Sequence, residues 1–359
     1  MTLLVLLGVV TTIAVLSQTA STTTTTSSTT TSTMPRERPQ SGWAVASTSG
    51  RGVLVDYRRV VVAGATFRVI RLRARTVLLR WHVGSLDPHL SAKVPPDAGT
   101  SIDWASEGPA GVVALFNGGF KQEALAGGSM ADGVTLVAPV KGDMTIALDD
   151  AGHWAMGAWG APGFPPAGFR PISYRQNLAP LVLHGAPTAA ALSAKWPRWG
   201  SPLHNVPPEP RTGIGVDARG NLLYVATMDP VLAPSLARAL VAVGAVTAMQ
   251  LDINPFWPIL GASFHPVHAR GGSYPVQIPG SQHSPTIYET SWTRDFFVAL
   301  AEPSNWNCNW RSPGLNPRRA GTAQPQRLVR VGPGCTRVPG HPTTTSTSTV
   351  PVTTSPPAP

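Results

Sequence analysis

The chain has 359 residues, with 28 Lys plus Arg, 18 Asp plus Glu and a formal net charge of +10 at pH 7. Only 13% of the residues are charged, about half the usual share. No repeated apolar runs of about 18 residues are present, which excludes a multi-span membrane protein. The 37 Pro and the low charge exclude a coiled coil, and the two Cys exclude a zinc-finger array.

The N-terminal end has the composition of an export signal followed by a linker. Residues 3–16 form an apolar run that is shorter than the ~20 residues of a membrane span, which is typical of a secretory signal. We therefore predict a signal peptide over 1–20, with an uncleaved anchor tethered through residues 3–16 as the alternative. Residues 21–40 are Ser/Thr-rich and are expected to be a disordered linker. The protein is expected to be secreted or associated with the cell envelope.

The positive charge lies mainly outside the predicted domain at 41–302. Residues 303–359 form a Pro/Thr-rich tail with six Arg and no acid, whereas the domain has only three more basic than acidic residues. The charge therefore does not predict a nucleic-acid partner, and the tail is expected to contact an anionic cell envelope. Cys308 and Cys335 also lie in this tail. They are predicted to form one disulfide in an exported chain, with two unpaired thiols as the alternative.

Strand patterns dominate the domain. Alternating or continuous apolar residues bounded by turn residues predict strands at 53–57, 60–62, 67–72, 76–81, 112–116, 133–137, 144–148, 153–157, 212–216, 222–227 and 246–251. The turn at 217–221 predicts a hairpin. One helix is predicted near Pro234, with an apolar stripe that ends at Gly244. The fold class is therefore α+β: a β-rich single domain with mixed sheets and few helices, flanked by disordered tails.

The first motif follows the apolar strand at 112–116. Asn117 offers a donor and an acceptor, and Gly118 and Gly119 allow close backbone approach to a ligand through an N–H nest. A plain Asn-Gly-Gly turn is the alternative interpretation.

Two further motifs contain charged residues at strand ends. Arg211 begins a strand whose small residues leave space for a guanidinium to hold a phosphate or carboxylate; pairing with a nearby acid is the alternative. Asp252 directly follows the strand at 246–251, where an unpaired acid is costly to bury. It is therefore a candidate acid, base, nucleophile or metal ligand, with a cap or turn role as the alternative.

The three motifs, in this order and with this secondary structure, resemble the phosphodiester glycosidase family over about residues 115–258. The resemblance implies an exported hydrolase of sugar–phosphate glycosidic bonds in envelope or exopolysaccharide glycans. Arg211 would then bind the phosphodiester, Asn117 with the Gly118 and Gly119 amides would orient its oxygens, and Asp252 would stabilise the oxocarbenium-like centre or act as base or nucleophile.

The loop after Asp252 departs from the family pattern. The family usually has a Gly-rich stretch there, whereas this chain has Ile253-Asn254-Pro255-Phe256-Trp257. A loop of this kind supplies bulk and a stacking surface instead of backbone amides, so Asn254 and Trp257 are expected to bind substrate. The departure also favours an alternative, a non-catalytic envelope polysaccharide-binding protein on the same fold. The sequence contains no cofactor motif, and it does not exclude a bound divalent cation.

Overall fold

The computed structural model describes residues 42–88, 99–124, 126–193 and 198–302, together with two short strands at 306–308 and 335–337. Two compact units are distinguished, Met1–Arg38 and Pro39–Pro359, and every described residue belongs to the second. The predicted signal or anchor, the linker and most of the basic tail lie outside the described residues. No helix in the described ranges is long and apolar enough to cross a membrane.

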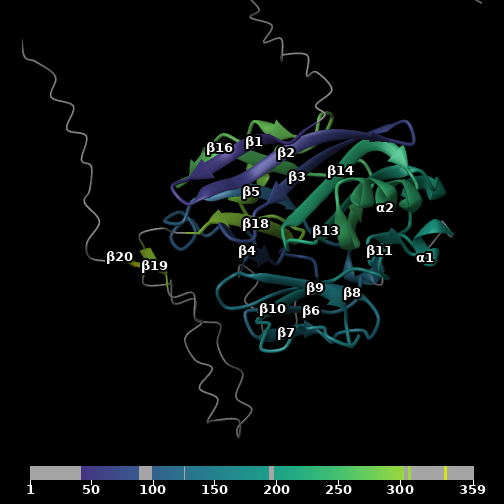
Figure 1. Cartoon of the computed structure of the whole chain (residues 1–359), viewed down its shortest axis with the longest axis horizontal. Coiled ribbons are helices and arrows are strands. Elements are labelled where there is room, and N and C mark those ends of the chain that lie inside the picture. The colour runs from purple at the N-terminus through teal and green to yellow at the C-terminus, as the bar shows by residue number, and fades with distance from the viewer. Residues whose placement is uncertain are drawn as a thin grey trace, which may run out of the picture. The chain divides into compact units, whose positions relative to one another are not determined.

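The largest sheet has eight strands in the order β1-β2-β3-β14-β13-β15-β11-β12. Figure 1 labels β1, β2, β3, β14, β13 and β11 of this sheet. Its strands are β1 (Ala44–Ser49), β2 (Gly52–Val62), β3 (Ala65–Leu72), β11 (Val182–Leu183), β12 (Ala186–Pro187), β13 (Glu209–Asp217), β14 (Leu222–Val231) and β15 (Ala245–Ile253). We call it the eight-stranded sheet. It contains the β13–β14 hairpin expected from the sequence.

Two five-stranded sheets complete the domain. The β5 sheet has the order β17-β16-β5-β18-β4, and the β8 sheet has the order β7-β6-β10-β8-β9. The strands of the β5 sheet are β4 (Val77–His82), β5 (Val112–Asn117), β16 (Leu260–Val267), β17 (Val276–Gln277) and β18 (Phe296–Ala301). The strands of the β8 sheet are β6 (Ser129–Ala131), β7 (Val134–Val137), β8 (Met144–Leu148), β9 (Trp154–Ala158) and β10 (Ser173–Gln176).

The helices are few and short. The described α-helices are α1 (Ala189–Leu192) and α2 (Ala233–Ala242), and 3-10 turns lie at Gln122–Ala124, Leu203–Asn205 and Pro285–Glu289. The predicted helix is confirmed as α2, with Pro234 in its first turn and Gly244 at φ 98° just after its end. It covers the eight-stranded sheet (Figure 1) at Gly213, where an added Cβ would lie 3.3 Å from both Leu236 and Leu240. The space that Gly213 leaves on the face of the sheet is therefore filled by the helix.

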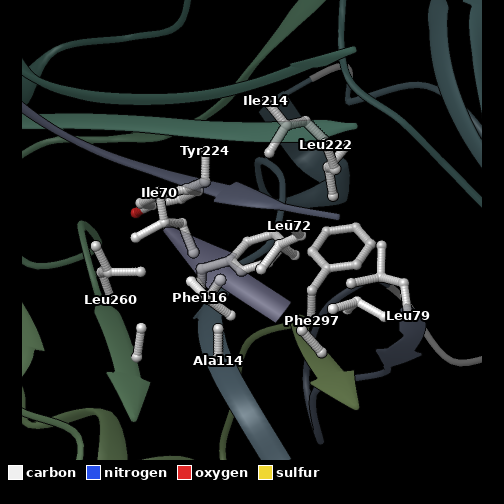
Figure 2. Close-up of a cluster of buried hydrophobic side chains, with 14 of the residues drawn as sticks. Ile70, Leu72, Leu79, Ala114, Phe116, Ile214, Leu222, Tyr224, Leu260 and Phe297 are labelled. Atoms are coloured by element: carbon white, nitrogen blue, oxygen red, sulfur yellow. The ribbon is translucent and has the colours of Figure 1, made fainter. Parts of the chain in front are cut away.

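The main core lies between the eight-stranded sheet and the β5 sheet, and the β8 sheet contributes to it. Figure 2 shows Ile70 and Tyr224 from one sheet packed against Phe116, Leu260 and Phe297 from the other. Because side chains alternate along a strand, Leu223 and Val225 face the opposite way and pack with α2. This double burial explains the continuous apolar runs in the sequence.

The β-rich fold class is confirmed, with two corrections. Every described strand pair is antiparallel, so the mixed sheets expected from the sequence are not found in the described part. The strands predicted at 53–57 and 60–62 form the single strand β2.

In the tail, β19 (Trp306–Cys308) pairs with β20 (Cys335–Arg337) so that Cys308 lies opposite Cys335. Their side chains lie outside the described residues, so the disulfide stays a prediction.

Candidate functional site

Asp252 lies at the end of β15, where the eight-stranded sheet meets the segment that precedes β18. Its Oδ2 accepts a hydrogen bond from Arg294 Nη2 at 2.5 Å, and its Oδ1 accepts one from Ile253 N at 2.9 Å. The residue is only 6% exposed. Burial raises the pKa of Asp252 from 3.8 to about 7, against the opposing effects of Arg294 and the Ile253 amide. The carboxyl is thus held in place and titrates near neutral pH.

Asn117, at the end of β5, is joined to Asp252 through Thr212. Asn117 Nδ2 donates to Thr212 Oγ1 at 2.9 Å, and Thr212 Oγ1 donates to the Asp252 carbonyl at 2.7 Å. Asn117 Oδ1 accepts from the Tyr224 hydroxyl at 2.7 Å. Because Asn117 is buried and its amide is hydrogen-bonded at both ends, it fixes the position of the strand that carries Asp252.

The Gly118-Gly119 turn is bound by an internal carboxylate. Gly118 N donates to the Asp295 carbonyl at 2.9 Å, and Gly119 N donates to Asp295 Oδ2 at 3.2 Å. The Asp252 amide in turn donates to the Gly118 carbonyl at 3.1 Å. Both glycine N–H groups expected to meet a ligand therefore already have protein acceptors.

Asp295 belongs to a buried network that the sequence analysis missed. Its Oδ2 accepts from Arg175 Nε and from Trp81 Nε1, each at 2.9 Å, and the Asp295 and Arg175 side chains are both 0% exposed. Arg175 also donates to the carbonyls of Gln176 and Phe120. This network links the β8 sheet to the β5 sheet, and Asp295 directly follows Arg294, the partner of Asp252.

A sequence signal for Arg294 and Asp295 existed. They directly precede an uninterrupted apolar run, Phe296–Ala301, which forms β18 and was not predicted as a strand. The strand-end reasoning that identified Asp252 would have identified this pair. Arg175 lies within β10, another strand absent from the prediction, and no local pattern marks it.

Arg211 points away from this cluster. Its Nε donates to the Val231 carbonyl at 2.8 Å, and its Nη1 donates to the Trp199 carbonyl at 3.0 Å and to Gln250 Oε1 at 2.9 Å. Burial lowers the pKa of Arg211 to about 10. Within the described ranges its guanidinium has no bond to Asp252 or Asn117, so the structure brings Asn117 and Asp252 together without Arg211.

The loop after Asp252 lies beside the Asp252–Arg294 pair. Asn254 has a left-handed φ of 76°, and its Oδ1 accepts the Phe256 amide at 3.0 Å. The ring centroid of Trp257 lies 4.7 Å from the Arg294 guanidinium carbon, a cation–π contact. Phe256 is 42% exposed. Aromatic rings thus follow directly after the strand that carries Asp252.

No group of three or more His, Cys, Asp or Glu residues that could hold a metal ion occurs in the described ranges. A depression of about 600 Å³ lies elsewhere, at the N-terminal end of α2, with Asp229 and Arg238 in its lining. It includes neither Asp252 nor Asn117. The candidate site is therefore a largely buried carboxyl–guanidinium pair beside partly exposed aromatic rings.

No protein-family model and no curated protein sequence matches the chain significantly. The structure is similar to the zebrafish N-acetylglucosamine-1-phosphodiester alpha-N-acetylglucosaminidase catalytic domain auto-inhibited by its pro-peptide. The TM-score is 0.45 at 13% identity, over 73% of this chain and 88% of that chain.

A hypothetical protein from Synechocystis has a TM-score of 0.43 at 13% identity, over 69% of this chain and 62% of that one. A Burkholderia pseudomallei protein described as a candidate exported protein has a TM-score of 0.35 at 11% identity, over 71% and 76% of the two chains. These similarities assign no role to any residue of this chain.

Proposed function

We propose that the chain is an exported hydrolase of the glycosidic C–O–P bond in sugar-phosphate diesters of envelope or exopolysaccharide glycans. The observation that supports this proposal is the Asp252 carboxyl, which is buried at a strand end, hydrogen-bonded to Arg294 and has a pKa of about 7. A carboxyl with a pKa near the working pH exchanges protons efficiently and is a recurrent feature of glycoside-cleaving sites. The basic tail is proposed to contact the anionic envelope.

In this proposal the oxygen of a water molecule bonds to the anomeric carbon as the bond from that carbon to the phosphate oxygen breaks. Asp252 accepts the proton of the water, and the phosphate monoester leaves with the bonding electron pair. Arg294 stabilises the charge that develops on the leaving phosphate. Asn117, Arg211 and the Gly118-Gly119 turn act as positioning residues, because their polar groups are already bonded within the protein.

The test is release of sugar from a panel of hexose-1-phosphate methyl diesters by the purified protein. Asp252→Asn keeps the size and an acceptor oxygen but removes the titrating group, and we expect it to lower kcat by about 100-fold. Asp150→Asn is the matched control, because Asp150 is an exposed acid in the β8–β9 turn. If the wild type releases no more sugar than Asp252→Asn from every diester in the panel, the hydrolase proposal is wrong.

A second candidate is a non-catalytic envelope polysaccharide-binding protein. The observation that favours it is the surroundings of Asp252, whose two carboxylate oxygens already accept hydrogen bonds and whose partner Arg294 is covered by Trp257. This candidate predicts saturable binding of glycan by wild type and Asp252→Asn alike, with no sugar released by either. Turnover that depends on Asp252 would exclude it.

A further inference from the structure

Four partly exposed rings gather beside the Asp252–Arg294 pair: Phe256, Trp257, Trp292 and His283. We call them the aromatic platform. Ring centroids are 6.4 Å apart for Phe256 and Trp257, 6.4 Å for Trp257 and Trp292, and 5.3 Å for Trp292 and His283. Each contact is edge-on, with interplanar angles of 61–66°. The platform joins the loop after β15 to the segments that precede β18.

Hydrogen bonds to backbone carbonyls hold both parts of the platform. Asn254 N donates to the Pro210 carbonyl at 3.0 Å, which anchors the loop that carries Phe256 and Trp257. The Ser281 hydroxyl donates to the Pro258 carbonyl at 2.6 Å. On the other side, Trp292 N donates to the Thr100 carbonyl at 2.8 Å. The rings are therefore arranged before any ligand arrives, which lowers the entropic cost of binding one.

Polar groups border these rings. Arg294 lies against the Trp257 ring, and its Nε, which is itself buried, has no hydrogen-bond acceptor among the described residues; Asp87 Oδ2 lies 4.0 Å from it. The guanidinium therefore keeps an unused donor although Arg294 is only 5% exposed. His283 and Asn254 add further polar atoms near the rings.

A small apolar surface with polar groups at its edge matches the chemistry of a sugar ring. A pyranose has an apolar face of C–H groups and a rim of hydroxyls, whereas a lipid chain or a folded protein partner needs a wider apolar area. Among the described residues, Phe256 is the only large hydrophobic side chain of the platform that is exposed. The patch therefore has the size of one ring.

We propose that the aromatic platform is a sugar-stacking subsite, which holds one pyranose ring of a glycan beside Asp252 and Arg294. The choice of a glycan rests on the proposed function, but the subsite does not require that the protein hydrolyses it. The subsite gives a physical role to the loop in which this chain departs from the glycine-rich family pattern.

The experiment measures binding of methyl hexopyranosides, the matching hexose-1-phosphate methyl diesters and the open-chain hexitol sorbitol, by saturation-transfer NMR and titration calorimetry. The key variant is Phe256→Ala, because Phe256 is exposed and the cation–π contact to Arg294 is made by Trp257. Phe264→Ala is its matched control, since Phe264 is 47% exposed on β16 and makes no ring contact in the described part of the chain. Thermal unfolding of each variant checks that the fold is kept.

We expect the wild type to bind at least one ring-containing probe and not sorbitol. Phe256→Ala should weaken binding about tenfold, while Phe264→Ala leaves it unchanged. Trp257→Phe should retain more affinity than Trp257→Ala, because a ring remains to stack. The proposal is overturned if no ring-containing probe binds, if sorbitol binds equally well, or if Phe256→Ala binds like the wild type.

The outcomes separate this proposal from the proposed function. Binding that is lost in Phe256→Ala, in a protein that releases no sugar, supports the subsite and contradicts the hydrolase. Hydrolysis whose KM is unchanged in Phe256→Ala supports the hydrolase and contradicts the subsite.

Discussion

Arg294 donates to the Asp252 carboxylate at 2.5 Å although the two residues are 42 positions apart in the chain. Asp252 is on β15 of the eight-stranded sheet, and Arg294 lies two residues before β18 of the β5 sheet. The pair therefore connects the two sheets at the edge of their shared core. Since both side chains are nearly buried, a change in either affects both the charge of the site and the contact between the sheets.

The pH dependence of stability should contain a component from Asp252. Its pKa in the folded protein, about 7, lies above the ordinary value of 3.8, so between these pH values the folded state binds a proton that the unfolded state releases. The free energy of unfolding therefore falls as the pH rises through this window. Asp252→Asn should flatten that fall, as measured by urea unfolding at several pH values between about 4 and 8.

Asp143, whose pKa is also raised by burial, contributes a slope of the same sign in both proteins. Parallel pH profiles for the wild type and Asp252→Asn would contradict the raised pKa of Asp252.

Asp295→Asn should be strongly destabilising. The substitution leaves the Arg175 guanidinium, which is 0% exposed, without its carboxylate partner. Breaking one side of a buried ion pair costs roughly 3–5 kcal/mol, whereas the exposed control Asp150→Asn should change stability by less than about 0.5 kcal/mol. Chemical denaturation measures both. A loss of less than about 1 kcal/mol for Asp295→Asn would show that the pair contributes little.

Gly118→Ala should also reduce stability, for a steric reason. An added Cβ would lie 2.1 Å from Asp295 Oδ2 and 2.7 Å from the Asp295 carbonyl oxygen. Relieving that overlap displaces the turn or the carboxylate, and overpacking of this kind costs about 1–3 kcal/mol. Gly50→Ala is the control, because nothing lies within 4 Å of its added Cβ. Equal unfolding midpoints for the two variants would contradict the close approach at Gly118.

Arg211→Lys separates the positioning role of Arg211 from the phosphate-binding role predicted from the sequence. A lysine cannot reach the acceptors at Val231, Trp199 and Gln250 together, so at least one buried acceptor is left unpaired. We expect a loss of about 1–3 kcal/mol in unfolding free energy. The exposed control, Arg219→Lys, should have no effect. A raised KM for a sugar-phosphate diester at unchanged stability would instead support direct contact with phosphate.

Local sequence patterns were sufficient for the parts of the site that lie at strand ends. The apolar runs before Asn117 and Asp252 end within two residues of the ends of β5 and β15, so the polar residues that follow could be located without knowledge of the sheet order. The helix between the last two motifs was predictable for the same reason. Its stripe of Leu236 and Leu240 and the Gly244 that ends it are local features of the sequence.

The rest depended on pairings that no local pattern contains. Arg175 and Asp295 are 120 positions apart, and only the packing of two sheets brings them together. The direction of Arg211 depends on the strand register, because the pairing of β13 with β15 is irregular between Arg211 and Gly213. A shift of this kind reverses the face to which a side chain points.

The Asp295 carboxylate, with its bonds to Arg175, Trp81 and Gly119, also constrains how the molecule can open. Trp81 is on β4, Arg175 is on β10 and Gly119 follows β5, so one side chain is bonded to groups from two sheets. Neither sheet can separate locally without leaving a buried charge unpaired. The amide hydrogens of Gly118 and Gly119 should therefore exchange with solvent only as slowly as the whole domain unfolds, although they lie in a turn.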